Sequence, residues 1–326
     1  MPLDSRAQRL LAMLAAGPGV DHSRVTAAER RRSFAALMRM AARPPAIETV
    51  ETTVVGGGGA LPARIYGPLG DPRRTLPGLV YFHGGGLVAG DLDTHDALCR
   101  WLADGAGCRV VSVGYRLAPE HPFPAAVEDA CAATVDVLER AAVFGLDPIR
   151  IAVGGDSAGA TLATVVSRAI RHRPGPRLAC QLLLCPVLDV EARTPSRLAF
   201  GEGHLLDAAL MRRDLVDYAP GMTDFDDPRL SPLRAADLAD MPPALIHTAE
   251  FDPLRDEGSA YSDLLRGAGV AVQLRCHAGM VHHFYGLTGF IPAAVAPLTE
   301  ISQELGRALR ADPGLEKLRR TSSVRA

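Results

Sequence analysis

The sequence predicts an α/β protein whose mostly parallel central sheet has helices on both faces and carries a helical cap. Three observations support this fold class. From residue 79 onward, short apolar runs alternate with segments of helical character, as in parallel strands joined by crossover helices. The runs 79–82 and 149–153 are almost entirely apolar, as expected for strands buried on both faces. Glycine-rich segments at 83–86 and 154–159 follow these two strands directly.

The composition is that of an ordinary globular chain. Of the 326 residues, 48% are hydrophobic and 22% are charged, and the formal net charge is -2. This balance offers no basic patch to a polyanion, so we expect no nucleic-acid partner. No uninterrupted apolar run reaches the length of a membrane span, so we also expect no stable membrane insertion.

The cysteines and the first residues bear on localisation. Six cysteines are dispersed without a C-x-x-C pair or a cluster with histidine at metal-ligand spacing, which favours free thiols in a reducing cytoplasm and no metal site. Arg6 and Arg9 before the apolar run 10–16 faintly resemble a signal peptide. The apolar residues there fall on one helical face, however, so an amphipathic helix explains them equally well. We therefore expect a cytoplasmic protein.

Two helices open the chain, at 2–16 and 26–40, and glycines 17 and 19 with Pro18 separate them. The second helix is apolar over a broad face and needs a surface to cover. The mouth of an active site is one candidate, and simple packing on the outside of the fold is the other. We assign residues 1–48 to a cap.

The main domain, 49–313, begins with strands at 50–55 and 62–66, which a run of four glycines joins into a hairpin at a sheet edge. The strand at 79–82 then runs into His83 and three glycines. Glycine N–H groups can approach a bound oxyanion without side-chain interference, so Gly85 and Gly86 are candidate donors of an oxyanion hole. We expect His83 to hold this loop by hydrogen bonds rather than to act as a base.

The alternation of helix and strand continues beyond the glycine loop. A helix is predicted over about 94–105, a strand over 109–113 and a second helix over 125–144. The intervening loop, 115–124, contains three prolines, which exclude helix there and indicate a rigid connection.

The strand at 149–153 and a helix at 160–170 flank the sequence G-D-S-A-G, in which Ser157 stands between Gly155 and Gly159. Glycines at these two positions leave room for neighbouring backbone at a sharp strand-to-helix turn that exposes a serine nucleophile. The N–H of Ala158 is then the third oxyanion donor. The alternative is a serine in an ordinary glycine-rich turn, and the flanking strand and helix argue against it.

After this turn, strands are predicted at 179–185, 243–249 and 271–276, and a final helix at about 292–309. The segment 187–232 interrupts the alternation of strands and helices. We expect a cap insertion over about 190–228 that contains a helix at 207–218. A plain crossover with one helix is the alternative. Residues 250–258 read as a turn, and the tail 314–326 has no apolar periodicity and is predicted to be disordered.

Ser157, Asp252 and His282 each follow a predicted strand, in the chain order nucleophile, acid, histidine. An imidazole must take the proton of a serine before it can attack, and a carboxylate must orient that imidazole. The three residues therefore form a candidate catalytic triad.

At these motifs the chain resembles the bacterial hormone-sensitive-lipase-like serine esterases, also called family IV. The matching segments are H-G-G-G at 83–86, Y-R-L-A-P-E at 115–120, G-D-S-A-G at 155–159 and D-P-L-R-D-E at 252–257. The resemblance implies an α/β-hydrolase fold with a helical cap. It also implies hydrolysis of short to medium acyl esters through an acyl-enzyme, without a cofactor.

One position departs from the family pattern. The family usually has H-G-F after its last strand, and here His283 stands at the place of that glycine. Gly279 and Phe284 keep the register that makes His282 the base. We expect the side chain of His283 to point to the pocket wall or to solvent.

Several functions share these residues. An amidase or an acyltransferase would use the same triad, because pocket shape selects the leaving group and the acceptor. Plant gibberellin receptors resemble the esterases but lack the histidine, so His282 argues against a ligand-binding relative. Epoxide hydrolases and dehalogenases would need an aspartate where Ser157 stands. The sequence therefore predicts a carboxylesterase acting on a small-molecule ester, and it leaves a homodimer open.

Overall fold

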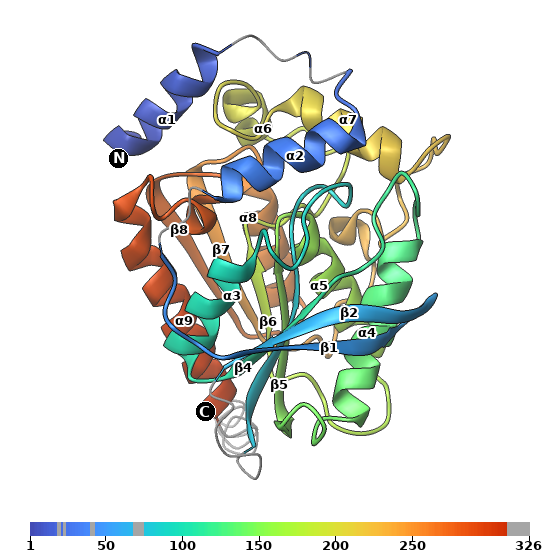
Figure 1. Cartoon of the computed structure of the whole chain (residues 1–326). Coiled ribbons are helices and arrows are strands. Elements are labelled where there is room, and N and C mark those ends of the chain that lie inside the picture. Colours follow the sequence, from blue (N-terminus) through green and yellow to red (C-terminus); the bar gives the residue numbers. More distant parts are fainter. Residues whose placement is uncertain (18–20, 22–23, 40–42, 68–74, 312–326) are drawn as a thin grey trace, which may run out of the picture.

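The computed structural model describes residues 1–17, 21, 24–39, 43–67 and 75–311. Within these ranges the chain forms one eight-stranded sheet in the order β1-β2-β4-β3-β5-β6-β7-β8 (Figure 1). β1 and β2, and β2 and β4, pair antiparallel, whereas all other neighbours are parallel. The strands are β1 Thr49–Gly56, β2 Gly59–Tyr66, β3 Leu76–Phe82, β4 Arg109–Val113, β5 Leu146–Asp156, β6 Gln181–Leu184, β7 Ala244–Phe251 and β8 Val272–Val281. The predicted fold class is thus confirmed.

Two apolar cores flank the sheet, because neighbouring side chains of one strand point to opposite faces. In β3, Val80 and Phe82 belong to the core that includes residues of helices α4, α5 and α8. Leu79 and Tyr81 belong to the core that includes residues of α3 and α9. These helices are α3 Asp96–Ala106, α4 Ala125–Glu139, α5 Ala158–Ile170, α8 Arg255–Gly267 and α9 Val295–Arg310.

Four further helices gather above the carboxyl ends of the parallel strands (Figure 1). They are α1 Ser5–Ala15, α2 Ala27–Met38, α6 Pro195–Phe200 and α7 Ala208–Tyr218. The start of α2 is fixed locally by a capping box, in which Thr26 and Glu29 each accept a hydrogen bond from the other's backbone N–H. The predicted helices at 2–16, 26–40 and 207–218 are therefore present, with shorter bounds where the structure describes them.

Two residues of the family-like motifs anchor these upper helices to the sheet domain. Arg31 of α2 donates to both carboxylate oxygens of Glu120, at 2.9 and 2.6 Å, and to the carbonyl oxygens of Val88 and Ala118. The fully buried carboxylate of Glu257 accepts the N–H of Leu188 at 2.7 Å and of Asp189 at 2.9 Å, and so fixes the start of the segment that carries α6 and α7.

The structure differs from the sequence prediction in several helices. Residues 250–258 are not a turn throughout, because α8 begins at Arg255 and buries Tyr261 and Leu265, which are one helical turn apart. The helix predicted over 125–144 ends at Glu139, and residues 140–145 form a turn that leads into β5. The short helix α6 was not predicted. The final helix begins at Val295, after a 3₁₀ turn at Pro292–Ala294.

Some strands are longer than predicted. β5, β7 and β8 extend to Asp156, Phe251 and Val281, because their last residues still pair with neighbouring strands. The predicted disordered tail lies outside the described residues. Among the helices that are described, none combines the length and the apolar character that crossing a membrane requires.

Candidate active site

Ser157 lies at a sharp turn between β5 and α5, with the unusual backbone angles φ 51° and ψ -119°. A Cβ atom on Gly155 would lie 2.4 Å from the backbone of Gly159, and one on Gly159 would lie 2.0 Å from the carbonyl oxygen of Phe82. Only glycine fits at both positions. This steric requirement is local, so the motif can be recognised in the sequence. A strained nucleophile turn of this kind costs on the order of 1–3 kcal/mol and persists because the surrounding sheet and helix fix it.

The three predicted triad residues meet in space although they are far apart in sequence. His282 Nε2 lies 3.2 Å from Ser157 Oγ, and His282 Nδ1 lies 2.8 Å from Asp252 Oδ2. Asp252 is fully buried, and its Oδ1 accepts the N–H of Leu254 at 2.9 Å. An ionised carboxylate only accepts, so the proton belongs on Nδ1, and Nε2 is then free to accept the serine hydroxyl.

The three predicted oxyanion donors line the same cavity as Ser157 and His282. Gly85 and Gly86 adopt φ angles of 116° and 68°, and a Cβ atom on Gly85 would lie 2.3 Å from the carbonyl oxygen of Ala89. Within the described residues, the N–H groups of Gly85, Gly86 and Ala158 donate to no protein acceptor. Unused donors facing a cavity are available to an anionic group there.

His83 supports the glycine loop. Its Nδ1 lies 2.9 Å from the carbonyl oxygen of Gly84, and its ring stacks on Tyr115 with centroids 4.3 Å apart. Burial, together with the nearby His95, lowers the pKa of His83 to about 4. A ring held in this way matches the expected role of holding the loop.

The cavity around Ser157 has a volume of about 560 Å³ and lies between the sheet and the upper helices. Its walls are mainly apolar, and the upper helices and the segments beside them contribute to it, among them Leu14, Phe34, Leu37, Leu205, Leu210 and Met211. A larger cavity of about 730 Å³ lies at the opposite end of the sheet, near Ala179 and Val270, and includes none of the triad. The smaller cavity is therefore the one that contains the candidate catalytic residues.

Two charged side chains from different upper helices meet beside the glycine loop. Arg30 of α2 lies 3.4 Å from Asp214 of α7, and both line the cavity. A Cβ atom on Gly86 would lie 2.0 Å from Asp214 Oδ2, so this carboxylate rests directly on the loop. Burial, partly offset by Arg30, raises the pKa of Asp214 to about 6. No sequence motif had drawn attention to this pair.

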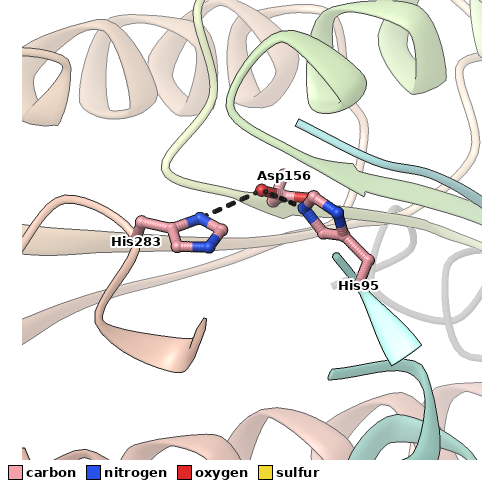
Figure 2. A group of neighbouring side chains, drawn as sticks. All are labelled: His95, Asp156 and His283. Atoms are coloured by element: carbon pink, nitrogen blue, oxygen red, sulfur yellow. Dashed lines mark hydrogen bonds and ion pairs between the residues drawn. The ribbon is translucent and has the colours of Figure 1, made fainter. Parts of the chain in front are cut away.

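His283 is placed differently from the expectation. Its ring is 4% exposed, so the solvent-facing alternative is wrong, although the residue does contribute to the cavity wall. Its Nδ1 lies 3.3 Å from Asp156 Oδ2, on the far side of that carboxylate from His95 (Figure 2). The cause is the backbone of His283, whose φ of 61° turns the ring away from Ser157.

Two groups of side chains have ligand atoms close enough to consider a metal ion: His95 with Asp156 and His283, and Cys185 with Asp252 and His282. In the second group the hydrogen bond between His282 and Asp252 already engages the ring nitrogen that faces the carboxylate. In the first, Asp156 Oδ1 already accepts the Tyr81 hydroxyl at 2.6 Å and the Gly84 N–H at 2.9 Å. Both groups are built as hydrogen-bonded clusters.

Comparison with known proteins supports this fold. A family model described as the alpha/beta hydrolase fold matches residues 79–286, and the chain belongs to this family. The esterase LipI of Mycobacterium tuberculosis is 45% identical over 253 residues, which cover 77% of this chain and 79% of LipI. The ethyl acetate hydrolase of Pseudomonas putida is 40% identical over 289 residues, 86% of this chain and 90% of that protein.

Solved structures of esterases are also similar to this chain. A thermostable esterase from Pseudomonas putida superimposes with a TM-score of 0.90 at 34% identity and covers 95% of this chain and 99% of its own. The predicted class, a carboxylic ester hydrolase of the hormone-sensitive-lipase-like type, is confirmed by these relatives.

Proposed function

We propose that Ser157, His282 and Asp252 carry out ester hydrolysis as nucleophile, base and orienting acid. Ser157 Oγ attacks the ester carbonyl carbon while His282 Nε2 takes the serine proton. The alcohol leaves with that proton, and an acyl-serine remains. Water, deprotonated by the same histidine, then attacks the acyl carbon, and the acid is released as the proton returns to Ser157. The carboxylate of Asp252 stabilises the imidazolium that forms in each half-reaction.

The observation that carries this proposal is the combination of two features in one cavity. One is the continuous contact from Ser157 Oγ through His282 to Asp252, at 3.2 and 2.8 Å. The other is the set of unused N–H groups of Gly85, Gly86 and Ala158, which suits the charge that develops on the carbonyl oxygen of the ester. A removed oxyanion donor typically costs about 10²- to 10³-fold in kcat.

The cap supports a preference for short to medium acyl chains. We assign cap function to residues 1–48 and to about 190–228, because side chains from both segments line the cavity over Ser157. A cavity of about 560 Å³ accommodates a finite acyl chain, and a longer one must extend beyond it or displace the helices above it. The relative named for ethyl acetate acts, by its name, on a very small ester.

An amidase or an acyltransferase would use the same arrangement, and the ligand-binding alternative is disfavoured by the contact that His282 makes with Ser157. The homodimer is likewise a proposal: β8 is the last strand of the sheet, and an edge strand offers unpaired backbone groups to a second copy. Cytoplasmic localisation is supported by the six cysteines, which are all described and all free.

The direct test is Ser157→Ala, which removes only the reactive oxygen. We expect turnover of p-nitrophenyl butanoate to fall to about a thousandth of wild type or below, with an unchanged melting temperature. A fluorophosphonate probe should label the wild-type serine and not the variant. A folded variant that keeps more activity than this would remove Ser157 from the mechanism.

A further inference from the structure

His283 occupies a backbone position that favours glycine. Its φ and ψ of 61° and 20° lie in the left-handed region, between the end of β8 and the 3₁₀ turn Phe284–Gly286. A non-glycine residue is strained there, although histidine tolerates this region better than most. The turn separates two adjacent rings: those of His282 and His283 lie 6.5 Å apart, and the first faces Ser157 while the second faces Asp156.

The partner of His283 is a carboxylate that already joins two parts of the site. Asp156 is the residue before Ser157 and is fully buried. Its Oδ1 accepts the N–H of Gly84, the first glycine of the oxyanion loop, at 2.9 Å. His95, from the segment after that loop, lies 3.3 Å from the same oxygen (Figure 2). Through His283, the loop after β8, which also carries His282, is the third part of the site that contacts Asp156.

The charge on Asp156 makes these contacts strong. Burial alone raises the pKa of Asp156, but His95 and His283 outweigh it and hold this pKa well below its usual value. Asp156 is therefore ionised, and the Nδ1–H of His283 donates to it. Such charge-assisted bonds inside a protein are about twice as strong as neutral ones.

The other edge of the His283 ring touches the cap. Its Nε2 lies 2.8 Å from Met38 Sδ, and its centroid lies 5.7 Å from that of Phe34, both on α2. The ring is thus held between the carboxylate beneath the nucleophile and the cap helix above it. Its two neighbours in sequence are the base, His282, and the buried Phe284.

We propose that His283 is a positioning residue: by joining the loop after β8 to Asp156 and to helix α2, it fixes the ring of His282 against Ser157. This inference rests on the proposed role of His282 as the base. Catalytic groups must be held within about 0.5 Å of their productive placement. A displacement of 1 Å can cost about 10²-fold in rate. The contacts of His283, the residue beside the base, with Asp156 and α2 should therefore affect kcat directly.

Three substitutions at one position separate hydrogen bonding from packing. His283→Gly removes the ring and relieves the left-handed backbone. His283→Asn leaves a similar void beneath α2 but places an amide N–H near the position of Nδ1, and asparagine tolerates the left-handed region. His283→Gln carries its amide farther out, near the position of Nε2, and cannot replace the bond to Asp156. His172→Asn, at an exposed histidine in the turn after α5, serves as the control.

With p-nitrophenyl butanoate, we expect His283→Gly to lower kcat about three- to tenfold with KM within about twofold of wild type, because the base is displaced and the pocket is not. His283→Asn should recover most of this loss, and His283→Gln should not. If Asn behaves like Gly, or if Gly lowers the melting temperature but leaves kcat at the wild-type value, the ring only fills space and the proposal is wrong.

Asp156→Asn supplies an independent check, because its amide oxygen can still accept from Gly84 while its NH₂ faces His283. In a double-mutant cycle, Asp156→Asn should lower kcat in the wild-type background. In the His283→Gly background, the fold-decrease in kcat that the same substitution causes should be at least three times smaller. Additive losses would overturn the proposal. His282→Ala, measured alongside, separates the two claims: retained activity there would refute the base itself, whatever the His283 variants show.

Discussion

At the scale of single residues, the backbone conformation of the glycine loop limits which residues can stand in it, as the proposed chemistry limits the residues of the triad. Gly85 combines a φ of 116° with a backbone oxygen 2.3 Å from where a Cβ atom would lie. An alanine there must displace the loop, and with it the N–H groups of Gly85 and Gly86 that face the cavity. The strength of an oxyanion hole depends on donor placement, so this displacement affects the rate before it affects the fold.

We therefore predict that Gly85→Ala lowers kcat/KM by about 10²- to 10³-fold. The matched control is Gly269→Ala, in the turn before β8, where φ is 76° and an added Cβ atom meets nothing within 4 Å. That control should lose about 1 kcal/mol of stability from backbone strain and keep its activity. Steady-state kinetics and thermal melting of both variants test this, and equal activities would show that the loop does not serve as the oxyanion hole.

The sequence reveals some of these residues and conceals others for physical reasons. Gly155, Gly159 and Gly85 are recognisable because a local steric demand admits only glycine. The direction of His283 could not be predicted, because it depends on a left-handed backbone and on the distant Asp156. The contact between Asp214 and Gly86 depends on how α7 settles over the sheet, and no periodicity encodes that.

At the scale of elements, the ion pair of Arg30 and Asp214 joins two upper helices that are far apart in sequence, α2 and α7. Burial, despite Arg30, raises the pKa of Asp214 from 3.8 to about 6, and Asp217 and Arg213 of the same helix add smaller opposing effects. A folded pKa above the unfolded one means that the folded protein binds this proton more tightly. Its contribution to stability is full below about pH 4 and is lost as the pH rises through 6.

Asp214→Asn removes this titration. Relative to wild type, the variant should gain on the order of 2 kcal/mol in free energy of unfolding between pH 4 and pH 7.5, because the wild type must bury a charge and the amide need not. Arg30→Met should raise the pKa of Asp214 further, since it removes the attraction that lowers this pKa. Its loss of stability with rising pH should therefore be larger than that of the wild type and should extend to higher pH. Urea unfolding across this range is the measurement, and parallel curves for variant and wild type would contradict it.

Helix α8 begins in a segment for which the sequence predicted a turn. Its first residues, Arg255 to Gly258, follow Asp252 and Pro253, which are turn-forming residues, and Gly258 lowers helix propensity. The helix forms because its buried face, with Tyr261 and Leu265, packs against the sheet, and tertiary packing outweighs the local preference. The strands were easier to predict, since burial on both faces leaves an unbroken apolar run.

At the scale of the whole molecule, we expect substrate choice to depend on a cavity that no single element encloses. Its walls come from α1, α2, α6, α7 and the sheet domain, and its volume is about 560 Å³. We predict faster hydrolysis of butanoate than of hexadecanoate p-nitrophenyl esters, because each methylene beyond the available space must displace the side chains that line it.

An ester series from acetate to hexadecanoate, with a butyranilide as the amide counterpart, measures this preference. The kcat/KM values should peak at a short or medium chain, and the anilide should be cleaved more slowly than the ester. Rates that keep rising to the longest chain would contradict a closed cavity, and anilide cleavage at the ester's rate would favour an amidase.

The order of the strands has a consequence for synthesis of the protein. His282 follows β8, the outermost strand of the sheet, and stands 125 residues after Ser157. A ribosome makes Ser157 and the glycine loop long before it makes His282. On the mechanism we propose, an unfinished chain carries a serine that cannot yet attack cellular esters, and hydrolysis begins only when the far edge of the sheet has been translated and has docked.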